Sequence, residues 1–324
     1  MIDAAQPSGG YALLQRLSDA SGATRRQLDT AQQQVATGRV ADSYAGLGAG
    51  ARTTLDLRPQ IQHQQVWQTN IDTAAGRLDA TQSALRSVAG IAADFYARTN
   101  NLNQLGVSEA DAIAASARSA LQQVGQLLNT RVGDVYVFAG QDSANPPVPD
   151  TSPSVLATAL LASDTATAPF SATLGTALPE VEVGEGQRVS TGVLANRNTL
   201  ATSAAPTTGS YMRDVMRALA TLTTVTGGPG TEAVAADTRS RLNSAISAMA
   251  AETGSLGDIQ SNLTARKAGL VDLSTALTKQ VSAVEDVDLA AALTRVSTLQ
   301  TQLQASYQLI AGAKDLSLAK FLPA

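Results

Sequence analysis

The sequence has no cysteine, one histidine and one tryptophan, and only 3% of its 324 residues are aromatic. Without cysteine the chain cannot form a disulfide or a cysteine-ligated zinc or iron–sulfur site. A single histidine, His63, leaves few ligands for a transition metal, and any histidine-dependent nucleophile would have to use it. His63 lies among glutamines, where an exposed helical position is expected. We therefore predict no enzymatic activity, no metal site and no cofactor.

Charged residues are also scarce, at 15%, and the formal net charge is −4. Nucleic-acid binding needs a basic face, and no dense Lys/Arg cluster occurs, which argues against a nucleic-acid partner. No apolar run reaches the length of a membrane span, so no membrane insertion is expected. The first residues lack the charged and apolar regions of a secretory signal. A protein of this kind that acts outside the cell would leave without a cleaved signal peptide.

Small apolar residues, mainly Ala, Leu and Val, supply most of the 44% hydrophobic content, which suits closely packed helices. In the last forty residues, apolar side chains recur at steps of three or four, which predicts one helical stripe. Ser282 and Glu285 have the spacing of a capping box, so we expect the helix to begin there. The stripe consists of Leu289, Leu293, Val296, Leu299, Leu303, Tyr307, Ile310, Ala313 and Leu316.

A second narrow seam lies near the N-terminus, in a predicted helix that ends near Thr37 and Gly38. It consists of Leu14, Leu17, Ser21, Thr24, Leu28, Ala31 and Val35. Two such seams predict a mainly α fold: an elongated antiparallel helical bundle or coiled coil formed by both chain ends. The predicted assembly interface comprises Leu14, Leu17, Leu28, Val35, Leu289, Leu293, Val296, Leu299, Leu303, Tyr307, Ile310 and Leu316.

Between the ends, apolar periodicity predicts a helix over 61–102, a second over 108–132, a third over 210–225 and a long helical region from about residue 232. The glycine-rich stretch around Gly46, Gly48 and Gly50 is interpreted as a flexible connector, because a nucleotide-binding loop would need a preceding strand. The run GDVYVFAG, residues 133–140, predicts a strand or hairpin arm.

The segment 145–206 holds most of the prolines, and its run LPEVEVGEGQRVSTGVLAN predicts a β-hairpin. We interpret it as a small, irregular, β-rich outer insertion that is dispensable for the core fold. The predicted domains are a terminal coiled coil of 1–35 and 285–324, a helical rod of 36–144 and 207–284 with a β-hairpin element, and the insertion 145–206.

The tail DVDLAAALTRVSTLQTQLQASYQLIAGAKDLSLAKFL resembles the C-terminal segment of the flagellin superfamily. Within it, QLQASYQLIAGAKDLSLAKFL is more similar to the hook–filament junction proteins than to flagellin. Thr37-Gly38-Arg39-Val40 and the GDVYVFAG run also match, and the resemblance covers about 10–143 and 210–322. Asp42-Ser43-Tyr44 stands where the family usually has an acid pair.

This resemblance implies a structural axial component of the bacterial flagellum, exported through its hollow axis, that joins the hook to the filament. Its implied partners are a ring of copies of itself, a hook-associated adaptor, flagellin and an export chaperone. An alternative is flagellin, which differs in having far more copies. A secreted coiled-coil adhesin or a type III translocator-like protein is a more remote alternative.

Replacing His63 with Ala should leave swimming unchanged, because we expect this side chain to have no catalytic or ligand-binding role. Soft-agar motility of a strain that carries His63→Ala checks this. Loss of swimming at a normal protein level and with normal export would contradict it.

Overall fold

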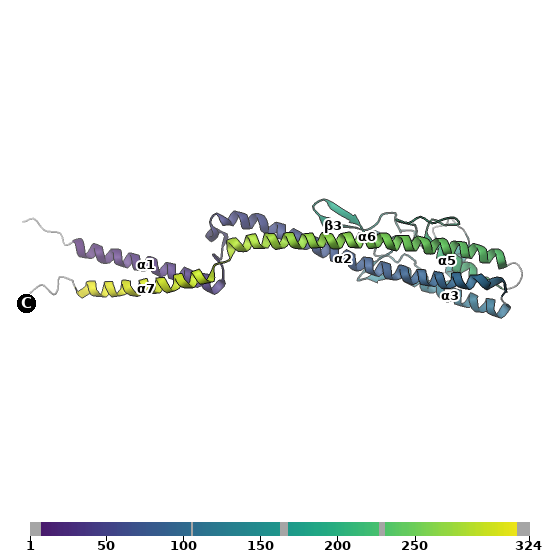
Figure 1. The fold of residues 1–324 in the computed structure, drawn as a ribbon, viewed down its shortest axis with the longest axis horizontal. Helices are drawn as coiled ribbons and strands as arrows, with labels where there is room; N and C mark the ends of the chain where they lie inside the picture. Colours follow the sequence, from purple (N-terminus) through teal and green to yellow (C-terminus); the bar gives the residue numbers. More distant parts are fainter. Residues whose placement is uncertain (1–7, 105, 163–167, 227–230, 316–324) are drawn as a thin grey trace, which may run out of the picture. The chain divides into compact units, whose positions relative to one another are not determined.

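The computed structural model describes residues 8–104, 106–162, 168–226 and 231–315, and within these residues it is built mainly of long α-helices (Figure 1). The chain divides into two compact units. The terminal unit comprises residues 1–62 and 274–324, and the central unit comprises residues 63–273. The predicted three-domain division places its boundaries elsewhere, at residues 35 and 285 and around the segment 145–206.

The terminal unit contains α1 (Ser8–Thr37), a short 3₁₀ helix η1 (Tyr44–Leu47), the start of α2 (Gly50–Arg98), the end of α6 (Thr231–Glu285) and α7 (Leu289–Asp315). As predicted, α1 ends at Thr37. Gly38 follows with a φ of 70° and its N–H donates to the carbonyl of Gln34 at 2.9 Å. The glycine-rich stretch is not only a connector, because η1 lies within it and α2 begins at Gly50.

The predicted start of the last helix is wrong. Ser282 lies inside α6, which continues to Glu285, and α7 begins at Leu289. The true cap is Asp288, whose Oδ1 accepts from the backbone N–H groups of Ala290 and Ala291 at 2.9 and 3.1 Å. These bonds satisfy N–H groups that the first helical turn leaves without partners.

In the central unit, α2 continues to Arg98 and is followed by η2 (Thr99–Gln104), α3 (Val107–Leu128) and, later in the chain, α5 (Tyr211–Leu222) and α6. Ser210 caps α5 by accepting from the N–H of Arg213. One core, rich in leucine and alanine, joins these helices, as the composition predicts. Among its fully buried members are Leu78, Leu85, Leu121, Leu128 and Tyr211.

Polar side chains connect α2 with α6 along the central unit. Lys267 contacts Asp72 at 2.5 Å, and Gln260 donates to Asp79 at 2.7 Å and accepts from Gln82 at 3.1 Å. These partners are far apart in sequence and each pair requires a particular alignment of the helices. The contacts therefore fix the register of α2 against α6, which an alanine-rich apolar surface specifies weakly.

Two small antiparallel sheets complete the central unit. In the first, β1 (Arg131–Val132) pairs with β2 (Val135–Tyr136). Only β2 lies within the predicted strand run 133–140; β1 lies where the helix 108–132 was expected to continue, because α3 ends at Leu128. In the second, β3 (Glu180–Gly184) pairs with β4 (Gln187–Ser190), which confirms the predicted hairpin. Hydrogen bonds to strand carbonyls hold this hairpin against the helices: Arg266 donates to Val183 at 3.2 Å and Asn70 donates to Glu182 at 3.2 Å.

The segment 145–206 differs from the expected outward insertion. It contains a short helix, α4 (Pro153–Ala162), which begins with proline at the position where a missing N–H is tolerated. Leu156 and Leu160 on α4 are fully buried, and α4 packs against α3 and α5. Phe170, Val183 and Val193 also belong to the shared core. Proline excludes long helices here but not burial, so the segment contributes to the core.

Two glycines of α2 provide a test of the terminal unit. A Cβ atom at Gly50 would overlap with the Cγ1 methyl of Val284 on α6, whereas one at Gly76 would meet nothing. Val284 is β-branched and cannot easily move aside. We expect Gly50→Ala to destabilise the terminal unit by about 1–3 kcal/mol, as overpacking does.

Gly76→Ala is the matched control and should stabilise α2 by roughly 0.5–1 kcal/mol, because alanine favours helix more than glycine does. Thermal unfolding followed by circular dichroism, together with hydrogen exchange of residues 277–285, measures both effects. Unchanged exchange in Gly50→Ala would show that α2 and α6 do not make this close contact.

Candidate assembly interface

Helices α1 and α7 form an antiparallel pair within the terminal unit (Figure 1). Gly38, after the end of α1, bonds to Val287, just before α7, and further along the pair Leu28 packs with Leu299. The apolar cluster between the helices comprises Leu28, Ala31 and Leu299, with Val296 and Leu303 packed against it. The coiled coil predicted from the two chain ends is therefore confirmed.

The pair is connected by a joint that consists of residues 38–40, residues 285–287 and Arg58. Backbone N–H groups bond across it, from Val40 to the carbonyl of Glu285 at 2.7 Å and from Val287 to the carbonyl of Gly38 at 3.0 Å. Arg39 and Asp286 face each other in this short antiparallel bridge. The joint thus connects the backbone that follows α1 directly to the backbone that precedes α7 by hydrogen bonds.

A salt bridge from α2 strengthens the joint. Arg58 donates from Nε to Oε1 of Glu285 at 3.0 Å and from Nη2 to Oε2 at 2.6 Å, a two-pronged contact that fixes the carboxylate plane. Hydrogen bonding with Glu285 and its negative charge raise the pKa of Arg58. The Glu285 side chain is only 13% exposed, so the contact is partly shielded from water.

The structure separates the predicted interface residues into three groups. Leu28 and Leu299 are buried, while Leu17, Val35, Val296, Leu303 and Ile310 are half-buried. Leu289, Leu293 and Tyr307 are exposed, at 49%, 55% and 49%. Leu316 lies outside the described residues, and Leu14 outside the described side chains.

The single stripe predicted for the last helix is thus two adjacent faces. The seam against α1 follows Ala292, Val296, Leu299 and Leu303 in steps of four, three and four. Ala292, only 5% exposed, was missed because alanine occurs throughout this helix and gives little contrast. Leu289, Leu293 and Tyr307 lie beside the seam on what we call the exposed α7 face.

The other side of the seam is polar. A groove of about 430 Å³ there is lined by α1 and by Arg295 of α7. The α1 side chains that line it include Arg26, Gln27 and Gln34. The pair therefore has a flank with three exposed apolar side chains and a flank that is mainly polar and basic. Apolar side chains held on a helix in this way can be buried against another helix, which makes the exposed α7 face the candidate interface.

The described residues carry neither a membrane-spanning helix nor a metal-binding cluster. No helix there combines the length and apolarity required to cross a membrane. Within the same residues, no three His, Asp or Glu side chains come together as a group that could hold a metal ion. His63 is exposed, as expected, and contacts Trp67 edge to face, with 5.9 Å between ring centroids.

Paired terminal helices with an exposed apolar face suit a structural protein that packs against other helices. Residues 12–143 match the bacterial flagellin N-terminal helical region, and residues 240–322 match the bacterial flagellin C-terminal helical region. The chain belongs to the flagellin family, whose members are structural, non-enzymatic proteins. It is thus an axial protein of the extracellular flagellum, and the family implies self-assembly there.

Solved structures of hook-associated proteins are similar to this chain. A putative flagellar hook-associated protein from Vibrio parahaemolyticus matches with a TM-score of 0.58 and 10% identity, over 75% of this chain and 99% of that one. Flagellar hook-associated protein 3 from Legionella pneumophila has a TM-score of 0.44 and 12% identity, over 75% and 98%. At 10% identity, the similarity to the Vibrio protein shows a shared fold and nothing more specific. No curated protein sequence matches.

Leu299 and Leu293 provide a matched test of the two α7 faces in the isolated protein. Leu299→Asp places a charge in the α1 seam, where Leu299 is only 5% exposed, and should release α1 from α7. Leu293→Asp changes an exposed side chain and should leave the pair as it is. Helical circular dichroism and hydrogen exchange of residues 289–312 measure the difference.

The narrow seams of the two terminal helices predict that both ends fray in the free monomer, because isolated helices of this kind are marginal in water. The wild-type exchange rates in the same experiment test this. Equal exchange in wild type and Leu299→Asp, both slow, would mean that the seam does not hold the pair together.

Proposed function

We propose that this protein joins the flagellar hook to the flagellin filament. The observation that carries this proposal is the fold likeness to the Vibrio protein, described as a putative flagellar hook-associated protein, over 99% of that chain. The resemblance of residues 302–322 to the hook–filament junction proteins supports the same role. Flagellin is the second candidate, because both family matches describe flagellin regions.

The terminal unit suggests how such a joining role would work. The joint sets the register of α1 and α7, and the pair presents Leu289, Leu293 and Tyr307 at one flank. In an assembled ring, this flank would be buried against helices of neighbouring copies, the hook-side adaptor or flagellin. Burial that is available only in the assembly stabilises the assembled state by mass action. During export, a chaperone would cover the same surface.

Deletion of the gene distinguishes the two candidates. A junction protein should leave hooks intact and filaments missing in electron micrographs, with unassembled flagellin accumulating in the medium, because filament subunits then have nothing to bind. A flagellin deletion would instead leave the medium without that subunit. Immunogold labelling should mark one position between hook and filament, and labelling along whole filaments would favour flagellin.

Leu293 and Leu309 provide a matched pair for testing the interface itself. Both are exposed, at 55% and 63%, but their spacing of sixteen residues at 100° per residue places them on opposite sides of α7. In the deletion strain, Leu293→Asp should be exported and fail to incorporate, whereas Leu309→Asp should restore filaments. Electron microscopy and the amount of protein in the medium measure this. Restoration by both variants would exclude the exposed α7 face as the interface.

A further inference from the structure

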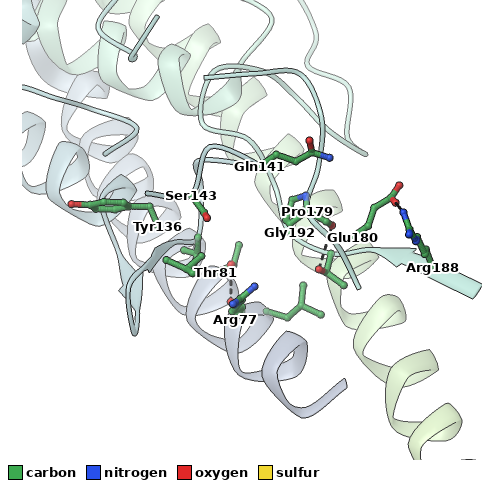
Figure 2. Close-up of a pocket in the computed structure, with 14 residues that line it drawn as sticks. Arg77, Thr81, Tyr136, Gln141, Ser143, Pro179, Glu180, Arg188 and Gly192 are labelled. Carbon is green, nitrogen blue, oxygen red and sulfur yellow. Dashed lines mark hydrogen bonds and ion pairs between the residues drawn. The ribbon is translucent and has the colours of Figure 1, made fainter. Parts of the chain in front are cut away.

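The central unit contains a pocket of about 330 Å³ that neither the family nor the proposed function accounts for. Three segments distant in sequence form it: residues 77–81 of α2, residues 135–143 at and after β2, and residues 179–192 around the β3–β4 hairpin. Figure 2 shows Arg77 and Thr81 at one side, Gln141 opposite them, and the pair Glu180 and Arg188 at a third. Its volume lies at the small end of the range for ligand pockets, about 300–1,000 Å³.

Arg77 is the unusual member of this lining. Its Nε is buried and has no hydrogen-bond partner among the residues that the structure describes. The neighbouring Thr81 hydroxyl donates to the backbone carbonyl of Arg77 at 2.8 Å and is not a hydrogen-bond partner of the Arg77 Nε. A buried donor without an acceptor is unfavourable, because it has lost its contact with water and gained nothing in exchange.

The only acid in the lining is already engaged. Glu180 forms an ion pair with Arg188 across the β3–β4 hairpin, with 3.9 Å between Oε2 and Nη1. The amide of Gln141 donates to the carbonyl of Leu178 at 3.4 Å. Among the buried atoms of these polar groups, only the Arg77 Nε is left without a hydrogen-bond partner.

The charges of the lining indicate what would fill this place. Arg77 and Arg188 carry two positive charges and Glu180 one negative charge, which leaves a single positive charge for a ligand to balance. A monoanion fits this balance, whereas a phosphate dianion would leave one negative charge unbalanced. The two oxygens of a carboxylate match the planar fork of an arginine.

We propose that this pocket binds a carboxylate, with Arg77 as its anchor. The carboxylate comes either from a small free molecule or from an Asp or Glu side chain of a second copy of this chain. Both sources present the same group to the guanidinium. They differ in whether binding depends on an added ligand or on the concentration of the protein itself.

The test follows the Nε–Hε resonance of Arg77 by NMR in the full-length protein, at fixed ionic strength, as sodium succinate replaces sodium chloride. Arg77→Gln identifies the resonance. Arg86→Gln is the matched control, because Arg86 also lies on α2 but bonds to Gln82 at 3.0 Å and is not part of the lining. A free carboxylate should produce a saturable shift of the Arg77 signal, lost in Arg77→Gln and retained in Arg86→Gln.

A second arm dilutes the protein without succinate. If the carboxylate belongs to a second copy, the Arg77 signal should move with protein concentration. Sedimentation should then show an association that Arg77→Gln weakens and Arg86→Gln does not. Circular dichroism verifies that both variants are folded.

One result would overturn the proposal: an Arg77 signal that responds to neither succinate nor dilution. If that unresponsive signal moves in Glu180→Gln, Arg77 is paired with Glu180 in solution. If the proposal holds, Glu180→Gln should strengthen carboxylate binding, because it removes a competing negative charge from the pocket.

Discussion

The terminal unit depends on a short antiparallel bridge between the two ends of the chain. The seam between α1 and α7 is too narrow to fix the register alone, because its buried apolar side chains are only those of Leu28, Ala31, Ala292 and Leu299. Apolar contacts of this kind tolerate a slip along the helix axis. Backbone hydrogen bonds from Val40 and Val287 do not tolerate a slip, because each requires one particular partner. Register is thus set at the joint and extended along the helices.

This dependence explains where the sequence predicts correctly and where it does not. Periodicity identified the terminal pair, most helices of the central unit and the β3–β4 hairpin, because these elements follow local patterns. The start of α7 was missed because Ser282 and Glu285 satisfy a local capping rule while lying inside α6. Glu285 is engaged by Arg58, which is 227 residues away in sequence, and no local pattern reports such a contact.

Two other differences have the same origin. The proline content of 145–206 limits helix length, but it does not reveal that Leu156 and Leu160 pack into the core shared with α3 and α5. In α7, apolar residues at steps of three and four form a stripe wide enough to include both the seam against α1 and the exposed α7 face. Only the position of α1 shows that Leu299 lies in the seam and that Leu293 lies beside it. That α7 is an apolar helix was predictable from the sequence. Which of its apolar side chains pack against α1 and which stay exposed was not.

The two units bury apolar surface to very different extents. The central unit has a large continuous core that includes Tyr211, Phe138 and many leucines, whereas the pair of α1 and α7 has a cluster of three buried residues with two more packed against it. Free energies of local opening are lowest where buried contacts are few. The region with the least internal burial is also the one that carries the exposed α7 face, with Leu289, Leu293 and Tyr307. An interface formed there gains the most from assembly, because the same contacts that join two copies would also stabilise helices that the monomer alone supports weakly.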